Sequence, residues 1–77
     1  MAAGFDAAWR SAAGEILARS TRVGLIRRGA LEVLVANSAL MQELTFQKTA
    51  LLEKLKRLLP DEKFTGLRFK VGPIESD

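Results

Sequence analysis

The most regular hydrophobic pattern in the chain is an alternation over 31–35, where leucine and valine occupy every second position. A period of two is that of a strand with one buried face. A second apolar stretch, 22–27, precedes it and also favours a strand. Gly29 lies between the two, where a short hairpin loop requires a positive φ. The pattern therefore predicts a β-hairpin.

The length of the hairpin loop decides which side chains share a face of the sheet. A three-residue loop at 28–30 pairs Leu25 with Val33 and gathers the apolar residues of both strands on one face. A two-residue loop would place Gly24 opposite Val33 and pack less apolar volume. We therefore predict the three-residue loop. The residues that it leaves on the other face are Arg22, Ile26, Glu32 and Leu34.

After residue 38 the apolar residues recur at the spacing of a helix. Leucines fall on one arc from 39 to 59, and Pro60 ends the pattern because proline cannot continue the hydrogen-bond ladder. Either Asn37 or Ser38 can cap the N–H groups at the start. The pattern predicts one uninterrupted amphipathic helix over 39–59.

Helical spacing also occurs near the N-terminus, where it predicts a first helix over 4–20. Its apolar stripe consists of Phe5, Trp9, Ala12 and Ile16. We expect Trp9 to anchor this helix in the core, the usual place of a tryptophan on such a stripe. Gly14 interrupts the pattern and favours a kink or a break.

The last alternation predicts a strand over 64–71, which ends at Gly72 and Pro73. Leu67, Phe69 and Val71 would face inward, whereas Arg68 and Lys70 would face outward. We expect 73–77 to be a frayed tail.

The elements together predict a single α+β domain over 1–77 in the order α-β-β-α-β, because 77 residues are too few for two domains. Two helices would cover one face of a three-stranded sheet. A right-handed crossover through the long helix would make the second and third strands parallel.

The composition excludes several kinds of functional site. The chain contains no cysteine and no histidine, which excludes disulfides, zinc sites built from those ligands and imidazole catalysis. No apolar run approaches the roughly 20 residues that span a bilayer, and the N-terminus does not resemble a signal peptide. We therefore expect a cytoplasmic protein with no membrane contact.

Motifs of catalysis are missing from the sequence. Neither a P-loop nor a GxGxxG pattern occurs, the carboxylates are dispersed, and the serines have no histidine to activate them. We predict a binding protein that is not an enzyme, with no cofactor, no metal and no small-molecule substrate. The net charge of +3 is compatible with a nucleic-acid partner and equally with a solvated basic face.

The sheet face without helices is the candidate binding surface. The basic residues expected on it or in the adjoining turn are Arg22, Arg28, Arg68 and Lys70. A second basic group, on the last turns of the long helix, consists of Lys54, Lys56 and Arg57. Cations neutralise phosphates, but no aromatic side chain is expected on this face for bases to stack on.

The same mixture of apolar and basic residues would serve equally well in a protein interface. The residues predicted for such an interface are Phe46, Ile26 and Leu34. Phe46 would lie on the polar side of the long helix, where an aromatic side chain is either covered by another part of the chain or contacts a partner.

The motifs of the whole chain stand in the order Trp9, Gly14, 28–35 (RGALEVLV), Ser38, Glu43-Leu44 and 67–72 (LRFKVG). In this order the chain resembles the DciA family, bacterial proteins that load or operate the replicative helicase. The resemblance implies a KH-like fold, contact with the hexameric DnaB-type helicase, and contact with DNA during replication initiation.

Two features limit the DNA contact that the resemblance implies. The GxxG loop with which KH domains clamp a nucleic-acid backbone is absent. We also expect that the basic extension that often accompanies this domain is absent. We therefore predict a non-catalytic, DciA-like adaptor with a weak or subsidiary DNA contact. The alternatives are a free-standing KH-like module that binds RNA or single-stranded DNA, and a protein–protein interaction module of unknown partner.

Overall fold

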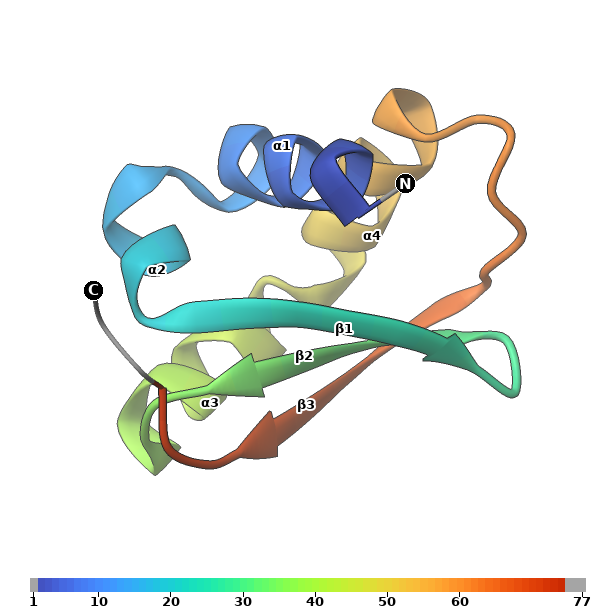
Figure 1. Cartoon of the computed structure of the whole chain (residues 1–77). Coiled ribbons are helices and arrows are strands. Elements are labelled where there is room, and N and C mark those ends of the chain that lie inside the picture. The colour runs from blue at the N-terminus through green and yellow to red at the C-terminus, as the bar shows by residue number, and fades with distance from the viewer. Residues whose placement is uncertain (1, 75–77) are drawn as a thin grey trace.

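The structure, a computed structural model, describes residues 2–74 and consists of a three-stranded sheet with helices on one side (Figure 1). The elements are α1 (Ala2–Ala13), α2 (Glu15–Arg19), β1 (Thr21–Arg27), β2 (Ala30–Val35), α3 (Ser38–Phe46), α4 (Lys48–Leu58) and β3 (Gly66–Val71). The α+β class and the α-β-β-α-β order are confirmed, with each predicted helix divided in two. Within residues 2–74 no helix combines the length and the apolar character needed to cross a bilayer.

The strands are arranged in the order β1-β2-β3, so β2 is central. β1 is antiparallel to β2, and β2 is parallel to β3 with an unbroken register from the Ala30–Gly66 pair to the Val35–Val71 pair. The parallel relation was predicted from the crossover. The adjacency of β2 and β3 is set by the structure.

The predicted hairpin register is wrong. The loop has two residues, Arg28 and Gly29, because Arg27 pairs with Ala30 and Ile26 with Leu31. The register then shifts between Val23 and Ile26, so that Val23 pairs with Val33 instead of Val35.

The shift is a β-bulge that sets Gly24 and Leu25 opposite the single residue Glu32. One extra residue restores the alternation, so Val23 and Ile26 both pack against the core despite the two-residue loop. Two assignments change as a result. Ile26, expected on the open side, lies on the helix side of the sheet, and Leu25, expected inside, is 70% exposed.

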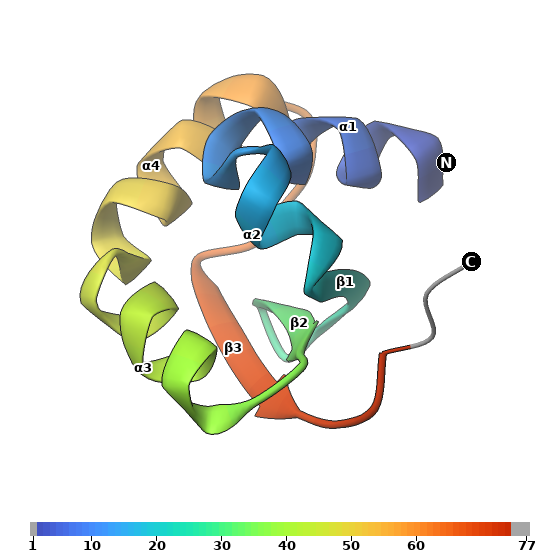
Figure 2. The ribbon, with the colours of Figure 1, turned by 90° about the vertical axis from the view of Figure 1, so that its left-hand side faces the viewer.

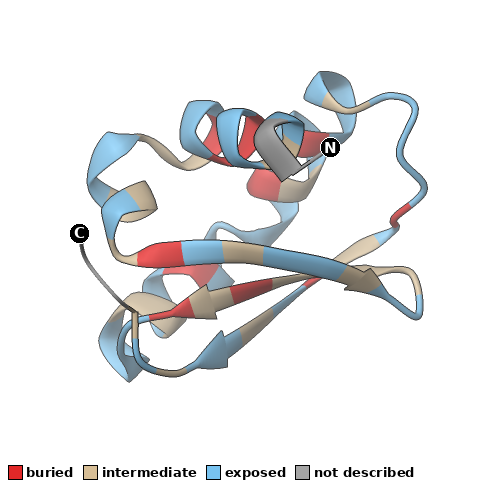
Figure 3. Ribbon diagram, viewed as in Figure 1, coloured by how far each residue is buried: buried red, intermediate tan, exposed pale blue. Residues whose placement is uncertain are grey.

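The core lies between the helices and one face of the sheet (Figure 3). Its buried apolar residues are Ala8, Trp9, Ala12, Leu31, Val33, Val35, Leu44, Leu51, Leu55, Phe64 and Leu67. The Nε1–H of Trp9 donates a 2.7 Å hydrogen bond to the hydroxyl of buried Thr21. That hydroxyl in turn donates to the carbonyl of Leu17 at 2.9 Å. Trp9 is therefore a core anchor, as predicted.

The first predicted helix breaks at Gly14, whose φ of 93° lies in the left-handed region that favours glycine. The break rotates the face that α2 presents to the core. Leu17 and Ala18 pack against the core, whereas Ile16, predicted to continue the apolar stripe, is 82% exposed.

The second predicted helix is also two helices, divided at Gln47. Asn37 is its N-cap, with the side-chain oxygen accepting from the Leu40 N–H at 2.9 Å. A continuous helix over 39–59 would be about 31 Å long. The longest dimension of the molecule is 29 Å, so a straight helix would overrun it. The break lets α3 pack against β2 and β3 while α4 packs against α1 and β3.

β3 begins later than predicted, at Gly66, and buried Phe64 lies in the preceding loop. Leu67 and Phe69 pack against the core, but Val71, on the same side of the strand, is 47% exposed. The N–H of Gly72 donates to the carbonyl of Val35 at 3.0 Å and closes the end of the sheet. Of the predicted frayed tail, Pro73 and Ile74 are described, and 75–77 lie outside the described residues.

Candidate nucleic-acid interface

The candidate site is the side of the sheet that faces away from the helices, called here the open face (Figure 2). Strand pairing identifies its residues. Arg22 is opposite Leu34, which is opposite Lys70, and Glu32 is opposite Arg68. Arg27, which was not predicted here, joins them because it pairs with Ala30. The open face therefore consists of Arg22, Arg27, Glu32, Leu34, Arg68 and Lys70.

Burial distinguishes the two faces of the sheet along β2. Its residues alternate between buried and half-buried over the whole strand. The half-buried set includes Glu32 and Leu34, whereas Arg68 and Lys70 on β3 are exposed. The predicted outward direction of Arg68 and Lys70 is therefore confirmed, and their side chains are accessible to a partner.

The cations of the open face lie on its two edge strands, Arg22 and Arg27 on β1 and Arg68 and Lys70 on β3. Arg68 and Lys70 are two residues apart, a rise of about 6.6 Å along the strand. Arg27 pairs with Ala30, which in turn pairs with Gly66. Arg27 is therefore level with the position two residues before Arg68. Arg22 lies at the level of Lys70. Positive charge thus extends over about 13 Å along the strands, divided between the two edge strands β1 and β3.

Positive charge is concentrated on this side of the molecule. With the turn residue Arg28 included, the open face carries five cations and one carboxylate, that of Glu32. The whole chain has a net charge of only +3, so the remainder is slightly negative. The Arg27 Nε is 3.9 Å from a carboxylate oxygen of Glu32, which leaves most of the positive charge unneutralised. A polyanion is attracted to such a surface.

A shallow groove of about 280 Å³ lies on the open face, between Arg22, Gly24, Glu32, Leu34 and Lys70. Gly24 brings the bulge close to Glu32, since a Cβ there would be 3.3 Å from the Glu32 carbonyl oxygen. Arg22 donates from Nη1 to its neighbour's carbonyl, that of Thr21, at 2.7 Å.

The structure separates the two basic groups predicted from the sequence. Lys54, Lys56 and Arg57 are exposed on α4, which packs beside α1 in the helical layer (Figure 1). The helical layer lies on the other side of the sheet from the open face. One linear nucleic-acid segment lying along the open face would not reach the α4 group.

The residues predicted for a protein interface have separate locations too. Phe46 ends α3 with its side chain 81% exposed, so no other described part of the chain covers it. Leu34 is half-buried in the groove of the open face. Ile26 belongs to the core and is no longer a candidate.

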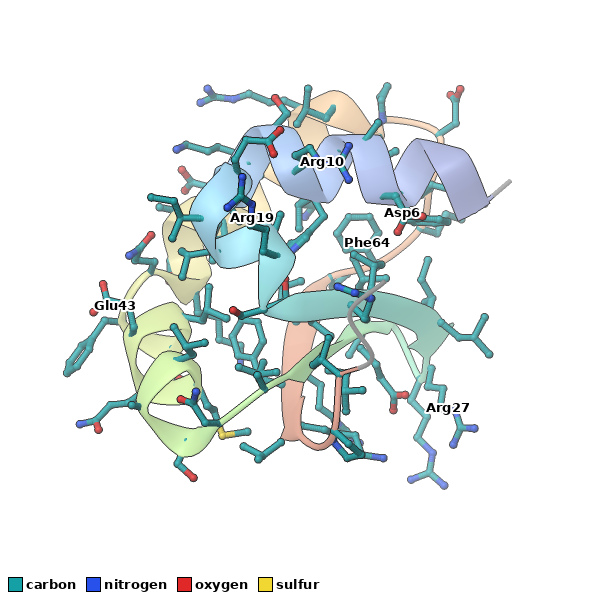
Figure 4. All side chains as sticks on the ribbon, turned by 60° about the vertical axis from the view of Figure 1, so that its left-hand side comes forward. Asp6, Arg10, Arg19, Arg27, Glu43 and Phe64 are labelled. Atoms are coloured by element: carbon teal, nitrogen blue, oxygen red, sulfur yellow. The ribbon has the colours of Figure 1, made fainter. Side chains whose placement is uncertain are left out.

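A second groove, of about 510 Å³, lies where α1, α2 and β1 meet (Figure 4). Its charged residues are Asp6, Arg10, Glu15, Arg19 and Arg22. Arg10 and Glu15 approach each other to 3.8 Å, so the charges there are mixed. The sequence pattern did not indicate this groove, because it exists only where Gly14 redirects α2.

Comparison with known families gives one finding on ancestry. The family model described as "Dna[CI] antecedent, DciA" matches residues 2–69, nearly the whole chain. No curated protein matches the chain. The matched segment includes every helix, all of β1 and β2, and β3 as far as Phe69. The chain therefore belongs to the DciA family.

Proposed function

We propose that this protein is a non-catalytic adaptor in DNA replication that contacts the replicative helicase and binds DNA through the open face of its sheet. Membership in the DciA family supports a replication-associated role. The observation that carries the DNA contact is the set of exposed cations on the two edge strands of the face that the helices leave uncovered.

The proposed DNA contact is with the phosphate backbone and is independent of base sequence. Cations that neutralise phosphates release counterions, which makes binding depend strongly on salt. Base stacking needs aromatic side chains, and the open face has none within residues 2–74. Phe69 lies on the core side, where its ring centroid is 6.5 Å from that of Trp9. Phosphate contacts position a protein on nucleic acid and carry no sequence information directly.

Phe46 is our candidate for the helicase contact. It is a large aromatic side chain in open solvent at the C-terminal end of α3, away from the cations of the open face. Exposed aromatic residues are enriched in protein interfaces because they bury a large area with little loss of conformational entropy. An adaptor with the two contacts on separate surfaces could hold DNA and helicase together. The KH-like fold and the cytoplasmic location stay predictions.

The DNA contact is tested by titrating a labelled single-stranded oligonucleotide at several salt concentrations. We expect the double variant Arg68→Ala/Lys70→Ala to lower affinity roughly tenfold at low salt. The log–log salt slope should fall in magnitude by about 1.4, or about 0.7 for each lost phosphate contact. A matched variant, Lys54→Ala/Lys56→Ala, removes the same charge from α4 and should have the smaller effect. If the α4 variant loses as much affinity or more, the open face is not the main DNA contact.

The same titration with RNA of the same sequence distinguishes the adaptor from a free-standing RNA-binding module. A clear preference for RNA would favour the module.

The helicase contact is tested by capturing the host's replicative helicase on the immobilised protein. We expect Phe46→Ala to reduce capture, while Ile16→Ala, at an equally exposed apolar position on α2, retains it. A wild-type protein that captures no helicase would refute the adaptor function. Loss in the Ile16 variant alone would place the contact on α2.

A further inference from the structure

The hairpin loop contains an unusual backbone conformation. Arg28 has a φ of 51°, and within residues 2–74 it is the only residue other than glycine with a positive φ. Gly29 follows with a φ of 80°. Two consecutive positive φ values in a two-residue loop are typical of a type I′ turn, which favours asparagine or glycine at its first position. An arginine there is strained, because its Cβ crowds the backbone.

Neighbouring backbone holds this turn in place. The carbonyl oxygen of Gly29 accepts from the N–H of Thr65 at 2.7 Å and from the N–H of Gly66 at 3.3 Å. Thr65 immediately precedes β3 and Gly66 is its first residue, so both donors are far from the hairpin in sequence. The turn is therefore fastened to the third strand, and the surrounding structure imposes the strained conformation of Arg28.

The turn adds a further cation next to those of the open face. Arg27 is the cation of β1 nearest the loop, and Arg28 lies beyond it at the tip of the hairpin, where it is exposed. Arg27 is beside Glu32, whereas Arg28 has no ion pair among the described residues. Figure 4 shows Arg27 at the hairpin end of the sheet, far from Glu43 of α3. The Arg28 guanidinium is therefore exposed and forms no ion pair with a carboxylate of residues 2–74.

We propose that the hairpin tip, Arg27-Arg28-Gly29, is the phosphodiester-binding end of the open face, and that Arg28 contacts phosphate from its strained position. The proposal rests on the proposed DNA contact and adds the place where the nucleic acid leaves the sheet. A guanidinium presents a planar fork of donors that matches two phosphate oxygens. Asparagine would suit the turn better but could not supply that charge.

The proposal is tested by substitutions that separate backbone strain from charge. Arg28→Asn relieves the strain and removes the charge. We expect its melting temperature to rise by several degrees, about 4 °C, while the log–log salt slope of DNA binding falls in magnitude by about 0.7–0.9. Arg28→Lys retains both the charge and the strain, so its melting temperature and salt slope should remain close to those of the wild type. Arg28→Asn would thus raise stability and lower DNA affinity, whereas Arg28→Lys would leave both nearly unchanged.

Single-stranded and duplex oligonucleotides are titrated in parallel, because both carry the phosphodiester. The oligonucleotide whose affinity falls more with Arg28→Asn is the one that contacts the tip. Unchanged binding by Arg28→Asn to both would overturn the inference. If Arg68→Ala/Lys70→Ala still weakens binding in that case, the open face remains the DNA contact and only the tip is excluded. A wild-type protein that binds neither oligonucleotide at low salt would refute the DNA contact itself, and the tip with it.

Discussion

The two faces of β2 differ in what surrounds them, although they belong to the same six residues. Leu31, Val33 and Val35 are fully buried beneath the helices. Glu32 and Leu34, between them, are half-buried on the open face among cations. Packing of apolar volume therefore constrains one face, while the other is free to carry charge. Substitutions on the two faces should separate stability from binding.

The largest expected effect comes from one chemical change made on each face. Leu31→Ala removes a buried side chain at the centre of the core and should lower the free energy of unfolding by about 2–5 kcal/mol. Leu34→Ala makes the same change three residues along, and we expect about 1 kcal/mol or less because that side chain is already half solvated. Urea denaturation of the two variants measures the difference. Equal losses would mean that the open face is covered.

The loss of a polar interaction should likewise cost more stability on the buried face than on the open face. Thr21→Val leaves the buried Trp9 Nε1–H without its 2.7 Å acceptor, which should cost about 1–3 kcal/mol of stability. Arg27→Gln breaks the 3.9 Å ion pair with Glu32 at the surface, for an expected change of about 0.5 kcal/mol or less. A double-mutant cycle of Thr21→Val with Trp9→Phe isolates the buried bond. A coupling energy near zero would show that the bond contributes nothing.

The smallest effect, and the most specific to the open face, is on affinity. Glu32→Gln removes the only carboxylate that residues 2–74 place on the open face and should raise DNA affinity about threefold at low salt. Glu53→Gln makes the same charge change at an exposed position on α4 and is the matched control. We expect it to leave affinity almost unchanged. A similar gain in both variants would show that only net charge matters, and not its location.

All of the open face except Arg27 could be predicted from the sequence, and Arg68 and Lys70 follow most directly from local alternation. The pattern over 64–71 placed Arg68 and Lys70 outward, since successive side chains of a strand must point to opposite faces. Arg27 could not be placed in this way. Its face depends on the bulge opposite Glu32, and one inserted residue reverses the side of every position beyond it.

The sequence by itself determined the α+β class, the element order, the buried face of β2 and the core position of Trp9. Those features follow from hydrophobic period and from the glycine and proline that interrupt it. Only the tertiary structure decided the hairpin register, the break at Gln47 and the separation of the two basic groups. A loop of either length and a straight helix both satisfy the local rules. The choice between them depends on whether distant side chains fill one core, and no short stretch of sequence contains that information.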